Sequence, residues 1–231
     1  MATTTREAGS APARLRLLAW LSPAFPVGSF SYSAGLEGAV HEGRVASADD
    51  LRDWIGTVLA HGSAWNDAVL FCEAWRLGGA GGDVAEMCAL AEALAGSLER
   101  HRETTLQGGA FLAAIRNWPG LRVPDFPRQS LAAPSYCVAV GAVAGANGVA
   151  LDEACAAFLQ AYVSNMIQAG IRLSVLGQTD AVGVLAALEP VVLDMTARAA
   201  TSSLDDLGAS AIMAEIVSMR HETQHSRLFR S

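Results

Sequence analysis

Residues 22–37 read SPAFPVGSFSYSAGLE, and this stretch decides how the chain enters its fold. Pro23 and Pro26 restrict the backbone to extended conformations and lack the N–H donors that a helix needs. The stretch therefore cannot be the interior of a helix, although apolar residues flank it on both sides. We expect a structured turn that leads out of a first helix over about residues 13–21.

The turn is followed by signals for a helix start and a helix end. Gly28 permits a change of chain direction, and Ser29 or Ser31 offers a side-chain oxygen that can cap a helix N-terminus. Gly43 is typical of the residue just beyond a helix C-terminus. These signals predict a helix over about residues 30–42. The side chains expected to face the core from it are Phe30, Leu36 and Val40.

Apolar residues spaced three and four apart recur through most of the remaining chain, which is the pattern of amphipathic helices. Ser47, followed by Asp49 and Asp50, marks one helix start. The longest apolar stripe, within residues 151–171, predicts the central helix, and Pro190 predicts an interruption further on. No segment shows sustained alternation with a period of two. The sequence therefore predicts an all-α fold, a single-domain helical bundle of about ten helices.

Three further features concern packing and the surface. Gly141 and Gly145 lie four apart on a face of small residues, so another helix can approach closely there, within the protein or across a dimer. Four prolines between residues 119 and 134 predict an irregular connection across the surface. Charged residues gather at 99–103, and this cluster is either a solvated helix face or a partner contact.

Composition excludes several classes of protein. The 231 residues are 52% hydrophobic with a mean hydropathy of +0.29, which is typical of a folded globular chain. The net charge of −7 argues against nucleic acid as a partner, because phosphate binding needs clustered Lys and Arg. A protein partner fits better. No apolar stretch reaches the roughly 20 residues that span a membrane, and residues 1–12 form a polar leader.

No pattern in the sequence indicates a catalytic or cofactor site. The chain lacks a Walker A phosphate-binding loop and a dinucleotide fingerprint after a strand. We therefore predict no catalytic residue, no cofactor and no enzymatic activity. The four cysteines stand apart, without metal-ligand spacing, and predict buried, reduced thiols in a cytoplasmic protein. They are Cys72, Cys88, Cys137 and Cys155.

One motif favours an alternative function. Residues 221–225 read HETQH, the HExxH arrangement that places two zinc ligands one helical turn apart with a glutamate as base. A zinc peptidase also needs a third protein ligand, normally further along the chain, and residues 226–231 contain no His, Asp or Glu. A zinc metallopeptidase is therefore an alternative, but we predict no metal site.

Three stretches, in the same order along the chain, resemble the signatures of one family, the urease accessory protein UreF. They are SPAFPVGSFSYSAGLE at residues 22–37, IRLSVLGQTD at 171–180 and MRHETQHSRLFRS at 219–231. The resemblance implies a non-enzymatic, cytoplasmic, all-α and usually dimeric assembly factor. Such a protein binds UreD, also called UreH, recruits the GTPase UreG and delivers nickel to apo-urease. A generic helical scaffold with unrelated partners is the second alternative.

The resemblance also bears on individual residues. The family more commonly has an aromatic residue where this chain has His225, so the HExxH pattern looks like a substitution that completes it by accident. Arg172 lies near a predicted helix end, where it either stabilises the helix dipole or anchors a partner beside Gln178, and the resemblance favours the anchor. Tyr32 is either a partner contact or a half-buried core residue.

The chain is expected to consist of a flexible leader at residues 1–12, an all-α domain at 13–218 and a partner-binding tail at 219–231. Three arginines against one glutamate give the tail a formal charge of +2, which suggests an acidic binding surface. Its apolar pair resembles interface anchors outside the core, although packing into the protein's own core is the alternative. The predicted contacts are Arg220, His221, Glu222, Arg227, Leu228, Phe229 and Arg230.

Overall fold

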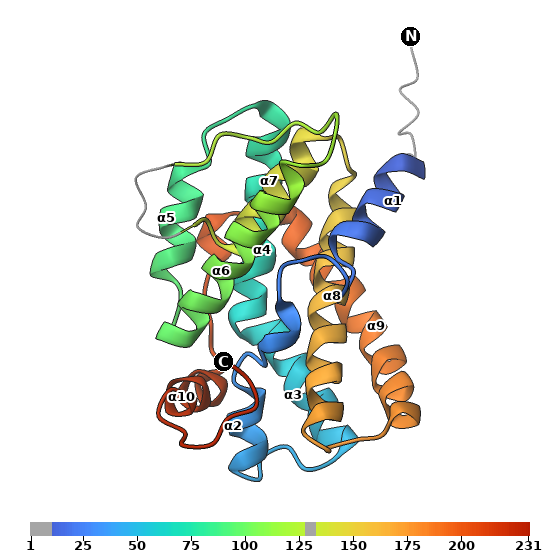
Figure 1. Ribbon diagram of the computed structural model, residues 1–231, viewed down its shortest axis with the longest axis vertical. Helices are drawn as coiled ribbons and strands as arrows, with labels where there is room; N and C mark the ends of the chain where they lie inside the picture. Colours follow the sequence, from blue (N-terminus) through green and yellow to red (C-terminus); the bar gives the residue numbers. More distant parts are fainter. Residues whose placement is uncertain (1–10, 128–132) are drawn as a thin grey trace.

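The computed structural model describes residues 11–127 and 133–231. Over these residues the backbone forms ten α-helices and two short 3₁₀ turns, and no strand, so the predicted all-α fold is confirmed. The leader predicted at residues 1–12 falls mostly outside the described residues. The elements are α1 (Ala11–Trp20), η1 (Ser29–Ser31), α2 (Leu36–His41), α3 (Ala48–His61), α4 (Ser63–Ala80), α5 (Ala85–Ala93), α6 (Leu98–Ile115), α7 (Tyr136–Ala146), α8 (Leu151–Arg172), α9 (Gln178–Thr201), η2 (Leu204–Asp206) and α10 (Ile212–His221) (Figure 1).

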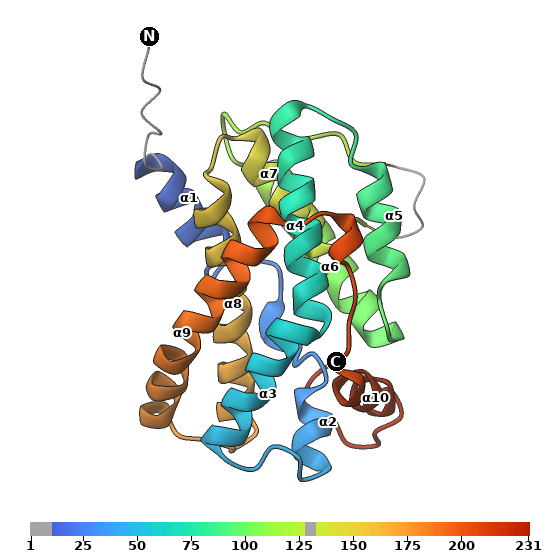
Figure 2. The same cartoon turned by 180° about the vertical axis from the view of Figure 1, so that it is seen from behind.

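The centre of the bundle is the contact between α4 and α7 (Figures 1 and 2). A Cβ atom on Gly78 would lie less than 3.0 Å from the carbonyl oxygen of Ala142, and Gly141 and Gly145 face the α4 backbone equally closely. The small-residue face predicted from the sequence therefore packs within this protein. Residues 137–146 are all buried, so α7 is the innermost helix.

Helices α8 and α9 pack against one another at the side of the bundle (Figure 2). Helix α8 contacts α1, α2, α3, α4, α7 and α9, as expected of a central helix, but Asp152 and Gln168 on its outer face are exposed, so α8 is less deeply buried than α7. The predicted interruption at Pro190 is wrong, because α9 continues through it. Pro190 and Ala186 are both exposed, so water can reach the Ala186 carbonyl that has no helical N–H partner.

The turn at residues 22–37 is longer than predicted. Only η1 and the short helix α2 form where a continuous helix over residues 30–42 was expected. Left-handed backbone at Ala34 (φ 49°) and Gly35 (φ 82°) separates the two, since a right-handed helix cannot contain it. Phe30, expected in the core, is 64% exposed, whereas Leu36 is fully buried and Val40 packs against the core.

The remaining local predictions largely hold. The hydroxyl of Ser47 caps α3 by accepting a hydrogen bond from the Asp50 amide at 3.2 Å. All four cysteines are buried and free, as predicted. Burial, with the nearby charges of Asp83 and Glu92, raises the pKa of Cys88 to about 11. No helix in the described ranges is both long and apolar enough to cross a membrane.

Candidate functional site

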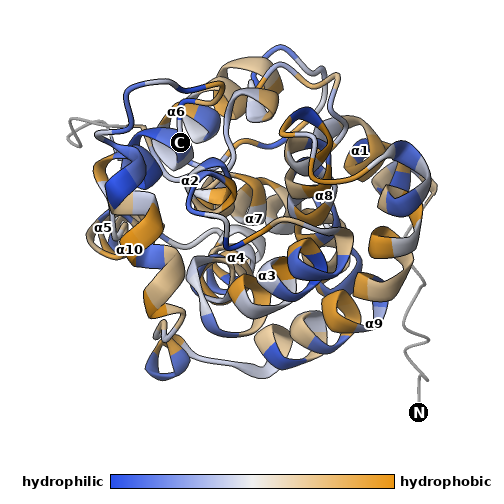
Figure 3. Cartoon of the chain, turned by 90° about the horizontal axis from the view of Figure 1, so that it is seen from below, coloured by the Kyte–Doolittle hydropathy of each residue, from blue (hydrophilic) through white to orange (hydrophobic). Residues whose placement is uncertain are grey.

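The C-terminal tail folds back onto the protein and ends beside α6 and the turn before α2 (Figures 1 and 3). Helix α10 brings the tail there by crossing α2 closely. Gly35 and Gly38 make this crossing possible, because a Cβ atom on either glycine would press on Ser218 or Val217 of α10. The crossing directs His221, the last residue of α10, into the space between α2 and α6.

The end of the tail pairs with the turn through backbone hydrogen bonds. The Arg230 amide donates to the Ser31 carbonyl at 2.8 Å, and the Ser33 amide donates to the Ser231 carbonyl at 2.9 Å. The Ser33 hydroxyl donates to the same Ser231 carbonyl. These bonds place the end of the tail against η1 and the two residues that follow it, so residues 29–33 form a docking surface for the tail.

Glu37 of α2 holds the preceding tail residues. Its Oε1 accepts the Leu228 amide at 2.6 Å, and its Oε2 accepts the Phe229 amide at 2.8 Å. The Phe229 side chain is 4% exposed and belongs to the hydrophobic core. The Arg172 guanidinium lies 4.3 Å from the centre of the Phe229 ring, a cation–π contact, and donates to the Phe30 carbonyl.

His221 is enclosed by two carboxylates from different helices. Its Nδ1 lies 2.6 Å from Oε2 of Glu99 on α6, and its Nε2 lies 3.1 Å from Oε2 of Glu37 on α2. The imidazole has no exposed surface, and both glutamate side chains are buried. Arg227 of the tail donates to Oε1 of Glu99 at 2.5 Å. We call these four residues, Glu37, Glu99, His221 and Arg227, the latch.

A second, partly buried ionic group continues from the latch along α6. Arg100 pairs with Asp67 of α4 and lies 3.5 Å from Glu103. The Ser231 hydroxyl donates to Oε2 of Glu103 at 2.9 Å, so this group also contacts the tail. Burial raises the pKa of Glu103, and the charge of Arg100 and the bond from Ser231 oppose that effect.

The tail's position corrects part of the sequence prediction. A tail outside the core was expected, but Phe229 and His221 are buried, so the alternative of packing into the protein's own core is right for Phe229. Leu228 remains 54% exposed, and Arg227 and Arg230 are exposed beside it. The physical reason is that the buried carboxylates of Glu37 and Glu99 need cations and N–H donors beside them. The tail supplies both.

The other predicted site residues lie outside the latch. Tyr32 is buried, and its carbonyl accepts a bond from Asn165 of α8 at 3.2 Å. Arg220 is exposed and pairs with Glu42 at 3.2 Å. Glu222 accepts the Leu98 amide at 2.8 Å. Gln178, the first residue of α9, is exposed.

Sequence reasoning missed the carboxylates that receive the tail. The cluster at residues 99–103 is neither simply a solvated face nor an open partner contact, because Glu99 and Glu103 are buried. Their spacing of four places both glutamates on one face of a helix, and the tail carries three arginines of opposite charge. That combination was the available signal, but it gave no distance between the two segments.

The HExxH pattern does not form the geometry of a zinc site. Helix α10 ends at His221, so His225 is exposed on the following turn and does not lie one helical turn above it. The nitrogens of His221 face glutamates instead. Over the described part of the chain, no three His, Cys, Asp or Glu side chains are arranged to hold a metal ion.

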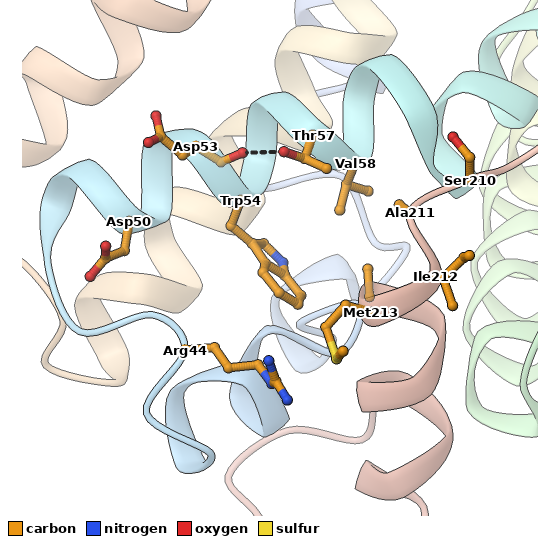
Figure 4. A pocket seen from close by; sticks show the side chains of 11 residues that line it. Arg44, Asp50, Asp53, Trp54, Thr57, Val58, Ser210, Ala211, Ile212 and Met213 are labelled. Atoms are coloured by element: carbon orange, nitrogen blue, oxygen red, sulfur yellow. Dashed lines mark hydrogen bonds between the residues drawn. The ribbon is translucent and has the colours of Figure 1, made fainter.

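A separate groove of about 540 Å³ lies between α3 and the start of α10 (Figure 4). Trp54, Val58 and Met213 give it an apolar lining. The carboxylate of Asp50 at its edge already accepts bonds from Ser47 and Ala46. The groove therefore combines apolar side chains with charged and hydroxyl groups, among them Arg44, Asp53 and Ser210.

Known proteins match this chain over almost its whole length. The UreF family model matches residues 45–189. The urease accessory protein UreF of Mesorhizobium japonicum is 57% identical over 96% of this chain and 98% of its own length. The urease accessory proteins UreF 1 of Brucella canis and Brucella anthropi are 58% and 54% identical, over 95% and 99% of this chain and 94% and 98% of their own lengths. With the all-α fold and a match that includes the turn and the docked tail, the chain belongs to the UreF family of urease accessory proteins.

Proposed function

We propose that this protein is a non-catalytic assembly factor that binds UreD, also called UreH, recruits the GTPase UreG and supports nickel insertion into apo-urease. The observation that carries the proposal is 54–58% identity to proteins named urease accessory protein UreF over 95–99% of the chain. We further propose that it acts in the cytoplasm as a homodimer, as the family signatures in residues 22–37 and 219–231 suggest.

A surface beside the docked tail fits a protein partner. Phe30, 64% exposed, accepts a hydrogen bond at its carbonyl from the guanidinium of Arg172, which lies over Phe229, and the exposed Leu228 and Arg230 are the two chain neighbours of Phe229. We call Phe30, Arg172, Leu228 and Arg230 the platform. Exposed aromatic, leucine and arginine side chains on a fixed backbone are typical of interface anchors. Their positive charge, on a chain of net charge −7, favours a partner with an acidic rim around an apolar pocket.

Co-purification tests the proposal at the level of the complex. The chain is produced with its cognate UreD and UreG, and the expected result is one complex containing all three proteins. Urease activity in a strain that lacks the gene for this protein should return when the gene is restored. A protein that binds neither partner would instead be a scaffold of another kind.

Phe30→Ala tests the platform with little risk to the fold, because the side chain is mostly exposed. We expect recruitment of UreD or UreG to weaken by about 2 kcal/mol, as for an interface anchor, with the melting temperature nearly unchanged. Leu193→Ala is the matched control, since Leu193 is 56% exposed on α9. Equal binding by the two variants would show that the platform is not part of the interface.

Arg172→Ala tests the same surface from the basic side. Arg198→Ala is its control, because Arg198 also covers an aromatic ring, that of Trp65 at 4.8 Å, on a different helix. Both variants lose one cation–π contact within the protein, worth about 1 kcal/mol or less. Only Arg172→Ala should reduce partner binding. A similar reduction in both would assign the effect to the fold.

A further inference from the structure

Two of the four cysteines lie together where α4 packs against α8 (Figures 1 and 2). Cys72 is on α4 and Cys155 is on α8, and both side chains are fully buried. Phe71, the residue before Cys72, stacks on Phe158 of α8 with the ring centres 5.0 Å apart. Phe158 follows Cys155 by three residues, so the two share one face of α8. The stacked rings therefore hold the two cysteines beside each other in the core.

The two thiols contact each other and differ in how readily they ionise. A hydrogen bond from the Cys155 thiol lowers the pKa of Cys72, although burial opposes this effect. The contact with Cys72, and then burial, raise the pKa of Cys155 well above its ordinary value. The charge of Arg76, one turn after Cys72 on α4, also lowers the pKa of Cys72, and its ion-pair partner Glu73 acts in the opposite direction. Cys72 is therefore the more easily activated sulfur of the two.

The other two cysteines have different neighbours. The sulfur of Cys137 lies 3.4 Å from the hydroxyl of Ser135, and burial raises the pKa of this thiol. Cys88 lies near the carboxylates of Asp83 and Glu92. Both cysteines are also buried, so exposure does not distinguish them from Cys72 and Cys155. What distinguishes the pair is a second thiol within contact.

Two thiols in contact, one of them activated, form a disulfide when a two-electron oxidant reaches them. We propose that Cys72 and Cys155 are a redox-active pair, which hydrogen peroxide converts to a disulfide between α4 and α8. Hydrogen peroxide is a small polar molecule, so local opening of the contact between the two helices is enough to admit it. This inference concerns the chain itself and does not depend on which partners it binds.

The oxidation consists of two balanced steps. The Cys72 thiolate attacks one oxygen of the peroxide, the O–O bond breaks, and a sulfenic acid forms while the other oxygen takes up the thiol proton and leaves as water. The sulfur of Cys155 then attacks the sulfenic sulfur, the S–O bond breaks, and the hydroxyl group leaves with the Cys155 proton as a second water. The pair loses two electrons and two protons, and the peroxide is reduced to water.

Counting thiols in the full chain tests the pair. The folded protein is treated with hydrogen peroxide, the excess is removed, and the free thiols are alkylated in denaturant and counted by mass spectrometry. We expect the four free thiols of the untreated protein to fall to two. Proteolysis should then release one disulfide-linked peptide pair that contains Cys72 and Cys155. Dithiothreitol should restore all four thiols, because a disulfide is reversible whereas sulfinic and sulfonic acids are not reduced by it.

Three variants assign the roles of the two sulfurs. Cys155→Ser should stop the reaction at the sulfenic acid of Cys72, which dimedone labels. Cys72→Ser should give neither dimedone labelling nor a disulfide. Cys88→Ser is the matched control, since it removes another buried thiol, and it should form the disulfide as the wild type does.

Three outcomes would overturn the proposal. They are the survival of all four thiols, the loss of all four together, which would show that oxidation follows unfolding, and a disulfide that contains Cys88 or Cys137. Circular dichroism before and after treatment should show the same helix content. The peptide pair from the wild type decides the case even if a serine variant does not fold, because that measurement needs no substitution.

Discussion

Glu37 is the residue on which the tail contacts converge. It receives the amides of Leu228 and Phe229 and the Nε2 of His221 within 2.6–3.1 Å. A glutamine would preserve the size of this side chain, but its amide nitrogen would present hydrogens to one of these donors. The carboxylate at position 37 is thus required by the tail and not by helix α2.

Glu103 provides a residue-scale prediction about pH. Burial raises its pKa in the folded protein, so the folded protein keeps a proton that the unfolded chain releases at the ordinary value for glutamate. The contribution of Glu103 to stability is present below that ordinary value and is lost as the pH rises through the raised value. We expect Glu103→Gln to gain melting temperature relative to the wild type as the pH rises above about 4, the ordinary value for glutamate. A difference that stays constant with pH would contradict the prediction.

At the scale of the helices, the packing depends on direct contact between the backbones of α4 and α7. Gly78→Ala would place a methyl group against the Ala142 carbonyl, so the helices must separate. We expect a loss of about 2 kcal/mol or more in the free energy of unfolding, measured with denaturant. Gly183→Ala makes the same change in α9, where a Cβ atom meets nothing within 4 Å. It should stabilise the protein by up to about 1 kcal/mol, and equal effects of the two variants would disprove the packing argument.

At the scale of the whole molecule, the tail joins elements that are far apart in the sequence. Deleting residues 222–231 removes Phe229 from the core and leaves Glu37 and Glu99 without their tail donors. We expect the free energy of unfolding to fall by about 3 kcal/mol or more, with helix content retained at low temperature. Leu228→Ala, at an exposed tail residue, should change stability by about 0.5 kcal/mol or less. Unchanged stability of the truncated protein would show that the tail is not part of the fold.

Residues close together in the sequence were enough to predict the helices, one helix cap and one close helix contact. Spacings of three and four predicted helices, Ser47 capped one of them, and Gly141 with Gly145 predicted a close helix contact. The three signature stretches led to the UreF family, which the comparisons confirm. These features are readable because each depends on residues within a few positions of one another.

The tertiary structure decided the features that depend on distant partners. The sequence could not show that Phe30 is exposed, that Glu99 is buried or that Phe229 enters the core. The sequence also predicted a break at Pro190. Helix α9 continues there because that side of the helix faces solvent. The contacts of His221 with Glu99 and Glu37 span 122 and 184 residues. A buried charge is stable only beside its counter-charge, and only the folded chain brings the two together.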